Sequence, residues 1–215
     1  MFDPSKKTLV FDFGNVLIDL DFEGCFQYLE RILEVDWSDR RLPEHIIKAI
    51  GQYDRGLIQD ESMIWAFQQV NDKTEAREIV KAWNSLITTM PAKRLDMLVD
   101  LRKDYNIALL SNINSMHIDY ALKYLKEEHG VDDFEVYFDH VFYSHMVGMH
   151  KPDVEIYNHV ANEMSVDPKD ILFFDDMKVN IEGAKEAGWN AILHEPDKEI
   201  LDEIEGYLEV GFNVV

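Results

Sequence analysis

The sequence predicts an α/β fold in which a parallel sheet forms the core and a small helical domain is inserted near the beginning. Short apolar runs alternate with longer amphipathic stretches, and this alternation favours a parallel sheet with right-handed crossovers. The apolar runs are almost unbroken, as in strands that are covered on both faces. One gap of about ninety residues follows the first run, whereas a βαβ unit needs only about thirty.

The expected strands are short and nearly continuously apolar, at residues 8–13, 107–110, 140–143, 171–174 and 190–193. Amphipathic stretches predict core helices near residues 91–103, 115–128, 154–164 and 179–187. The long gap holds four more such stretches, at residues 22–33, 43–53, 61–71 and 75–87. We therefore expect a Rossmann-like core formed by residues 1–19 and 91–215, and an α-helical cap formed by residues 20–90. Ligands bind beyond the carboxyl ends of parallel strands, so an insert that leaves the first strand would roof the site.

The composition narrows the classes of partner. Asp and Glu total 42 against 21 Lys and Arg, which gives a net charge of −21. Such a surface repels nucleic acid and anionic lipid, so we expect neither as a partner. The single cysteine, Cys25, excludes an internal disulfide and a cysteine metal cluster. The first residues lack the apolar core of a signal peptide and no apolar run is long enough for a bilayer, which predicts a cytoplasmic location. The oligomeric state cannot be read from the sequence.

Two strand ends carry groups that suit an anion. Asp12 interrupts the apolar run in FDFGN, where a carboxylate buried without partners is costly. It either caps the turn or attacks an electrophile, with the backbone N–H groups of Phe13 and Gly14 holding an anion. Ser111 and Asn112 end the second strand. A hydroxyl and a backbone N–H before a helix form an anion-binding corner, although both residues are also ordinary helix caps.

Two further strand ends carry charge. Lys151 precedes Pro152 in a constrained loop, where it is either solvated or the cation that an acidic protein needs at an anion site. Asp175 and Asp176 follow the fourth strand, and their mutual repulsion would be relieved by a divalent cation. Oxygen ligands suit Mg²⁺. The alternative is a favourable interaction with a helix start. Asn180, one helical turn beyond Asp176, is placed to steady the pair by hydrogen bonding.

The carboxyl ends of parallel strands share one edge of a sheet, so these four places can converge. Together they supply a nucleophile, a hydroxyl with a backbone donor, a cation and a metal site. Displacement at phosphorus requires this set of groups.

The four motifs, in this order and spacing, resemble those of the haloacid dehalogenase superfamily. FDFGNV is similar to its first motif, LLSN to the second, HKPDVEIY to the third and FFDDMKVNIEGAKEAGW to the fourth. The resemblance covers essentially the whole chain, and the inserted helices resemble the family's helical cap. The stretches FDFGNVLIDLDF, SNINSMH and FFDDMKVNIEGA are also similar to a bacterial sugar-phosphatase subgroup that includes an α-D-glucose-1-phosphate phosphatase.

The resemblance implies a Mg²⁺-dependent phosphatase that acts on a small phosphorylated metabolite, a sugar phosphate such as a hexose 1-phosphate. Asp12 would be the nucleophile and would form an aspartyl-phosphate that water then hydrolyses. Three residues would hold the phosphate: Ser111, Asn112 and Lys151. The metal ligands would be Asp12, the backbone carbonyl of Gly14 and Asp176, with Asp175 binding either directly or from one shell further out.

Gly14 departs from the family pattern, because phosphatases of this superfamily usually carry a second aspartate there as general acid and base. Losing such assistance costs about 10²–10⁴-fold in rate. A leaving hydroxyl as acidic as that of a sugar 1-phosphate depends less on a proton, and a cap residue or His150 can supply one. His150 itself stands where the sugar-phosphatase relative has arginine. Two other readings are a haloacid dehalogenase, which expels halide without a proton but needs no Mg²⁺, and a low-turnover protein that binds a phosphorylated ligand.

Overall fold

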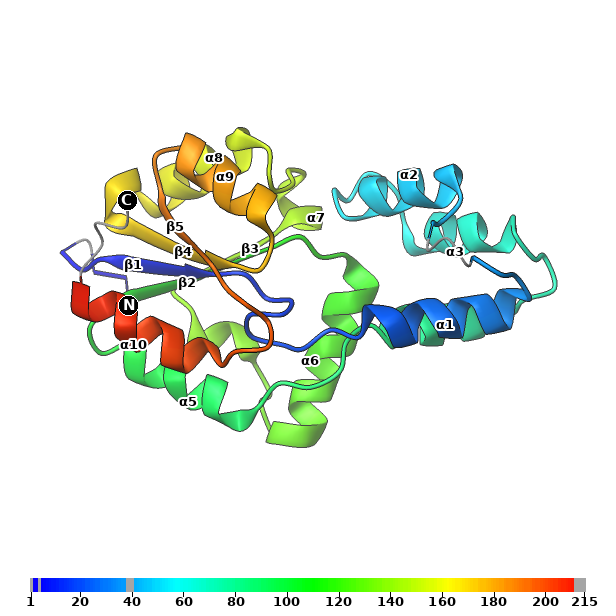
Figure 1. Ribbon diagram of the computed structural model, residues 1–215, viewed down its shortest axis with the longest axis horizontal. Coiled ribbons are helices and arrows are strands. Elements are labelled where there is room, and N and C mark those ends of the chain that lie inside the picture. Colours follow the sequence, from blue (N-terminus) through cyan, green and yellow to red (C-terminus); the bar gives the residue numbers. More distant parts are fainter. Residues whose placement is uncertain (1, 4, 38–40, 211–215) are drawn as a thin grey trace.

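The computed structural model describes residues 2–3, 5–37 and 41–210, so the two outer ends of the expected core, at residue 1 and at residues 211–215, lie outside the described residues. Five strands form one parallel sheet in the order β3-β2-β1-β4-β5 (Figure 1). The strands are β1 Thr8–Phe11, β2 Asn106–Ser111, β3 His140–Tyr143, β4 Ile171–Asp175 and β5 Asn190–Leu193. The predicted α/β fold with a parallel sheet is confirmed.

Successive side chains of a strand point to opposite faces of the sheet. Both faces are buried, so the strands are apolar at nearly every position. In β1, Leu9 and Phe11 belong to one apolar cluster and Val10 to another. The first strand ends at Phe11 and not at Phe13 as expected. The chain turns there, since the N–H groups of Leu17 and Ile18 both donate to the carbonyl of Phe13 at 2.9 Å.

Helices cover both faces of the sheet (Figure 1). Helices α5 Ala92–Leu101, α6 Ser115–His129 and α10 Ile200–Val210 lie on one face. Helices α8 Val154–Met164 and α9 Lys178–Glu186 lie on the other. The expected ranges 91–103, 115–128 and 179–187 differ from the observed helices by one or two residues at their ends. Helix α10 was not predicted, nor were the short helices α7 Ser144–Val147, η1 Phe134–Tyr137 and η2 Pro168–Asp170.

Four helices between β1 and α5 pack on one another to one side of the sheet (Figure 1). They are α1 Phe22–Leu33, α2 Glu44–Tyr53, α3 Asp60–Gln68 and α4 Ala76–Asn84, so the expected ranges 61–71 and 75–87 were too long at their carboxyl ends. Their own apolar cluster includes Leu29, Ile46 and Phe67. Met116, at the start of α6, joins this cluster and connects it to the core. The domain boundaries at residues 19–20 and 90–91 stay a prediction.

The two segments that connect this helical group to the sheet run side by side. Leu20 and Ile87 form an antiparallel bridge, and the N–H of Asp19 donates to the carbonyl of Thr89 at 2.7 Å. The buried guanidinium of Arg94 donates to Asp19 Oδ1, also at 2.7 Å. Asp21 begins α1 as its N-cap and accepts from the N–H of Gly24 at 2.8 Å. Both aspartates are therefore parts of the connection.

None of the helices in the described part of the chain combines the length and the apolar character that crossing a membrane requires.

Candidate active site

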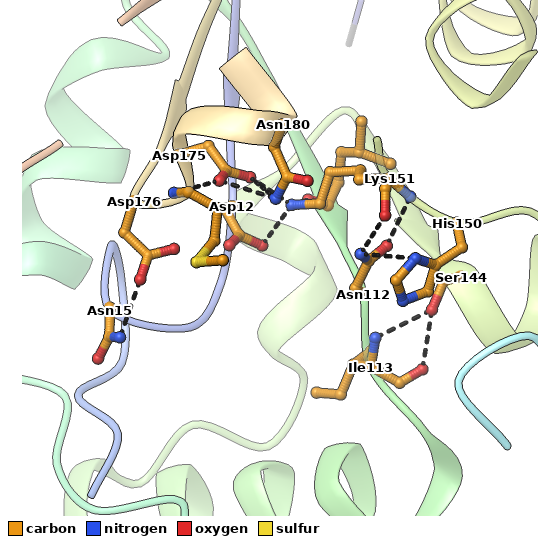
Figure 2. Close-up of polar contacts among 12 residues, drawn as sticks. Asp12, Asn15, Asn112, Ile113, Ser144, His150, Lys151, Asp175, Asp176 and Asn180 are labelled. Atoms are coloured by element: carbon orange, nitrogen blue, oxygen red, sulfur yellow. Dashed lines mark hydrogen bonds and ion pairs between the residues drawn. The ribbon is translucent and has the colours of Figure 1, made fainter. Parts of the chain in front are cut away.

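Asp12 lies one residue beyond the carboxyl end of β1, at the middle of the sheet. Its N–H donates to the carbonyl of Phe174 at 2.9 Å and so continues the pairing between β1 and β4. Its side chain is only 11% exposed. The ammonium of Lys151, itself 1% exposed, lies 2.8 Å from Asp12 Oδ1. The end of the central strand thus places the carboxylate of Asp12 beside a cation carried by the loop after α7 (Figure 2).

Asp175 is fully buried, and each of its oxygens accepts two hydrogen bonds. Oδ1 accepts from the N–H of Met177 at 2.8 Å and from Asn180 Nδ2 at 2.9 Å. Oδ2 accepts from Lys151 Nζ at 2.7 Å and from the same Asn180 nitrogen at 3.0 Å. Lys151 also donates to the carbonyl of Leu110 at 2.9 Å. Asp175 and Asn180 therefore position Lys151 beside Asp12 (Figure 2).

Asp176 faces the same space from the other side (Figure 2). Its Oδ2 accepts from Asn15 Nδ2 at 2.9 Å, and Asn15 adopts a left-handed backbone with φ 55°, which asparagine tolerates better than most residues. One carboxylate oxygen from each of Asp12, Asp175 and Asp176 lies within 4.8 Å of the other two. Oxygen atoms clustered in this way suit Mg²⁺. The residues present therefore fit a divalent cation.

The pKa values report how strongly this cluster is buried. Burial raises the pKa of Asp12 to about 7, although the charge of Lys151 acts in the opposite direction. Burial also raises the pKa of Asp176. Burial by itself would lower the pKa of Lys151, but the charges of Asp12 and Asp175 outweigh it and raise that pKa. The lysine stays charged and forms ion pairs with Asp12 and Asp175, while Asp176 lies in the same cluster. A further positive charge would stabilise the ionised forms of these carboxylates.

The second strand end brings Ser111 and Asn112 to the same edge. The Asn112 side chain binds the backbone of Lys151: Oδ1 accepts from its N–H, and Nδ2 donates to its carbonyl, both at 2.9 Å. Asn112 Nδ2 also lies 3.1 Å from His150 Nδ1. Burial lowers the pKa of His150 to about 4, so this imidazole is neutral near pH 7. Asn112 is therefore the side chain that fixes the loop carrying Lys151.

Gly14 leaves room for an apolar side chain beside Asp12. A Cβ atom placed on Gly14 would lie 2.7 Å from Leu20 Cδ1. The side chain of Leu20 therefore occupies the space beside Gly14 and would have to shift to admit a longer side chain there. Within the described chain, the N–H groups of Phe13 and Gly14 donate to no backbone carbonyl. The turn after β1 thus offers two backbone donors and no side-chain acid.

A cavity of about 320 Å³ lies between the helical group and the ends of β1 and β2. Phe13, Gly14, Ser111 and Asn112 line it on the side of the sheet. The opposite side is lined by residues of α1, α2, α4 and the segments beside them, and the hydrogen-bonded residues Asp54, Asn114 and His117 complete it. The helical group therefore covers the strand ends, as expected. The cavity between them is lined by four of the predicted site residues.

Residues 6–188 match the family described as haloacid dehalogenase-like hydrolase. The chain belongs to this family. A D-ribitol-5-phosphate phosphatase from Bacteroides thetaiotaomicron is 28% identical over 192 residues, which cover 88% of this chain and 92% of that protein. A sesquiterpene phosphatase from Aspergillus oryzae is 31% identical over 190 residues, covering 85% of this chain and 86% of that protein. The predicted family and the hydrolase class are confirmed, whereas the α-D-glucose-1-phosphate phosphatase subgroup stays a prediction.

Solved structures of haloacid dehalogenase family enzymes share the fold. One from Bacteroides thetaiotaomicron, an aspartate-to-alanine mutant in complex with magnesium and inorganic phosphate, matches with a TM-score of 0.85 at 27% identity. The match covers 93% of this chain and 99% of the chain in that structure. A magnesium complex of a family enzyme from the same organism matches with a TM-score of 0.83 at 28% identity. The helical group beside the sheet is consistent with the cap of this hydrolase fold.

Sequence reasoning missed two residues of this hydrolase site. Asn15 holds Asp176, and its position in the turn FDFGN was the available signal. Asn114, and neither Ser111 nor Asn112, is the N-cap of α6, and it accepts from the N–H of His117 at 3.0 Å. Its amide also donates to Asp54 of the cap at 3.0 Å. No sequence pattern connects Asn114 with Asp54, because sixty residues separate them.

Proposed function

We propose that this protein is a Mg²⁺-dependent phosphatase that hydrolyses the phosphate monoester of a small metabolite through an aspartyl-phosphate on Asp12. The observation that carries the proposal is the position of Lys151 Nζ, 2.8 Å from Asp12 Oδ1 and 2.7 Å from Asp175 Oδ2. A lysine held in this way neutralises charge beside the attacking carboxylate, as phosphoryl transfer requires. The phosphatases among the relatives support the same reaction class.

The residues that would hold Mg²⁺ are Asp12, Asp176 and the backbone carbonyl of Gly14. The oxygens of Asp175 are already engaged by Lys151, Asn180 and the N–H of Met177, so we assign Asp175 to positioning the lysine. When bound, the metal ion would offset the charge of the phosphoryl oxygens. The magnesium complexes of the similar structures support this assignment.

In the proposed reaction, a carboxylate oxygen of Asp12 attacks phosphorus as the bond from phosphorus to the leaving oxygen breaks, and the leaving oxygen takes a proton from solvent water. The N–H groups of Phe13 and Gly14, the hydroxyl of Ser111, the N–H of Asn112 and Lys151 would hold the phosphoryl oxygens. Water then attacks the aspartyl-phosphate, which releases inorganic phosphate and restores the carboxylate. His150 is neutral near pH 7 and does not act as a cationic acid.

The leaving group is the open part of the proposal. Similarity to the D-ribitol-5-phosphate phosphatase favours the predicted sugar phosphate as the substrate. Similarity to the sesquiterpene phosphatase favours a different class of phosphate ester. Halide displacement is less favoured, because it gives no reason for Asp176 and Lys151 to lie beside Asp12.

Release of inorganic phosphate from p-nitrophenyl phosphate, with Mg²⁺ and with EDTA, tests the reaction class. We expect release that needs both Mg²⁺ and Asp12, so that the Asp12→Asn variant gives only background. A chlorinated carboxylic acid in the same assay tests for halide. Halide release without metal, or phosphate release that Asp12→Asn leaves unchanged, would overturn the proposal.

A further inference from the structure

The cavity beside the proposed phosphate site is apolar on most of its surface. Its lining includes a large set of aromatic and aliphatic side chains from the cap and its connections, among them Leu20, Phe22, Phe26, Leu29, Leu42, Ile50, Trp83, Leu86 and Ile87. Ile113 adds an apolar side chain from the core. A group that enters this space from the phosphate site therefore leaves water for hydrocarbon, which is favourable in proportion to its own apolar surface.

Three polar side chains of the lining, Asp54, Asn114 and His117, hydrogen-bond within the protein. Asn114 Nδ2 donates to Asp54 Oδ1 at 3.0 Å and lies 3.3 Å from His117 Nδ1. The other imidazole nitrogen, His117 Nε2, lies 3.0 Å from the carbonyl of Trp83, and the two rings stack with centroids 4.7 Å apart. In the described chain the indole Nε1 of Trp83 is buried without a partner. Asn114, His117 and one oxygen of Asp54 are therefore engaged within the protein, and the remaining lining is mainly hydrocarbon.

On the sheet side, the cavity is lined by the polar residues Ser111 and Asn112 and by Phe13 and Gly14. Gly14 has no side chain, and Leu20 lies where one would project. Phe13, which is buried, lines the cavity on the adjacent position. The part of a leaving group directly beyond the ester oxygen therefore meets Leu20, and position 14 offers it no acid.

A sugar ring or a sugar alcohol carries a hydroxyl on nearly every carbon. Each hydroxyl that enters this cavity would lose its hydrogen bonds to water, and an unpaired buried hydroxyl is costly. We infer that the substrate is a phosphate monoester whose alcohol is predominantly apolar, with a hydrocarbon ring or chain that fills the cavity between Leu20, Ile50 and Trp83. This inference rests on the proposed phosphatase function and narrows its substrate class.

A pair of matched esters tests the inference. Cyclohexylmethyl phosphate and glucose 6-phosphate are both primary esters on a six-membered ring, so they differ mainly in the hydroxyls of the ring. We expect kcat/KM of the wild-type protein with Mg²⁺ to be at least about tenfold higher for cyclohexylmethyl phosphate. D-ribitol 5-phosphate serves as the open-chain polar probe and should behave like glucose 6-phosphate.

Two substitutions on helix α2 test whether the lining of the cavity causes the preference for the apolar ester. Ile50 lines the cavity, whereas Ile47 on the same helix is 56% exposed and is not part of the lining. Ile50→Gln should reduce the ratio of the two kcat/KM values at least about threefold by lowering the rate for the apolar ester. Ile47→Gln should leave the ratio unchanged. Leu86→Gln, at another partly buried position of the lining, repeats the test if Ile50→Gln does not fold.

The possible outcomes separate the two proposals. Equal rates, or a preference for glucose 6-phosphate or D-ribitol 5-phosphate that depends on Asp12, would overturn the apolar substrate and leave the phosphatase in place. A preference that survives in both Ile50→Gln and Leu86→Gln would also overturn it. Absence of Asp12-dependent phosphate release from all three esters and from p-nitrophenyl phosphate would refute the proposed function and the inference with it.

Discussion

The ammonium of Lys151 lies 2.8 Å from the carboxylate of Asp12, although 139 residues separate them along the chain. Both side chains are buried, and Asp175 and the carbonyl of Leu110 hold the lysine from its other sides. The loop after α7 and the end of β1 meet here because parallel strands deliver their carboxyl ends to one edge of the sheet. This contact is the one on which the proposed chemistry depends.

Replacing Lys151 by methionine should remove most phosphatase activity and destabilise the fold. The change leaves Asp12 and Asp175 buried without their cation, and breaking a buried ion pair costs about 3–5 kcal/mol. We expect kcat/KM to fall at least about 10²-fold. Phosphate release and urea unfolding measure the two effects. Lys126→Met, on the exposed surface, removes the same charge and should change neither. An active and stable Lys151→Met protein would contradict the assignment.

Magnesium should stabilise the wild-type protein against heat, and Asp176 should be needed for this effect. A ligand at about one hundred times its dissociation constant contributes about 2.7 kcal/mol to the folded state. Asp176→Asn should lose most of the upward shift in melting temperature that MgCl₂ produces, because it removes a proposed ligand. Asp132→Asn, which changes the same charge at an exposed site, is the control. Equal shifts in the two variants would exclude Asp176 as a ligand.

An acid introduced at position 14 should help poor leaving groups once space is made for it. In Gly14→Asp alone, the new side chain collides with Leu20, so we expect little gain. In Gly14→Asp combined with Leu20→Ala, we expect kcat for an alkyl phosphate to rise at least about tenfold relative to an aryl phosphate, up to the roughly 10²–10⁴-fold that acid catalysis provides. Gly14→Asn with Leu20→Ala is the matched control. If the asparagine protein gains as much, proton donation is not the cause.

The stability of the protein should fall with decreasing pH because of His117. Burial lowers the pKa of His117 to about 4, whereas the unfolded state titrates near the ordinary value of 6.5. The unfolded state therefore binds more protons between these values, and the stability contributed by neutral His117 is complete above pH 6.5 and is lost as pH falls toward 4. The expected loss at pH 5 is about 2 kcal/mol relative to pH 7.5.

Urea unfolding of the wild-type protein and of His117→Phe at several pH values measures this loss. Phenylalanine keeps a ring against Trp83 but does not titrate, so the difference between the two curves isolates the histidine. Asp54, whose pKa burial raises, titrates in both proteins. Parallel curves between pH 4 and 7 would show that His117 does not contribute.

The sheet was predictable from the sequence because strands buried on both faces read as unbroken apolar runs. Strands β3 and β5 were predicted at their observed limits, the ends of β2 and β4 to within one residue, and β1 two residues too long. Asp12, Ser111 and Asp175 could be placed at strand ends because a parallel sheet brings such ends to one edge. Lys151 was also expected at a strand end, but it lies in the loop after α7. Helix α10 and the short helix α7 were not predicted from the sequence pattern. The roles of these residues stay predictions until they are tested.

The sequence by itself determined the order of the elements and which polar residues follow which strands, because both depend on local patterns of apolar residues. Only the tertiary structure decided what surrounds them: Asn15 on Asp176, Asn114 on Asp54, and Leu20 over Gly14. The apolar cavity belongs to this second class, since its walls come from segments whose side chains look like ordinary core residues in the sequence. Which apolar side chains line a cavity depends on how the helices pack, and packing is a property of the whole fold.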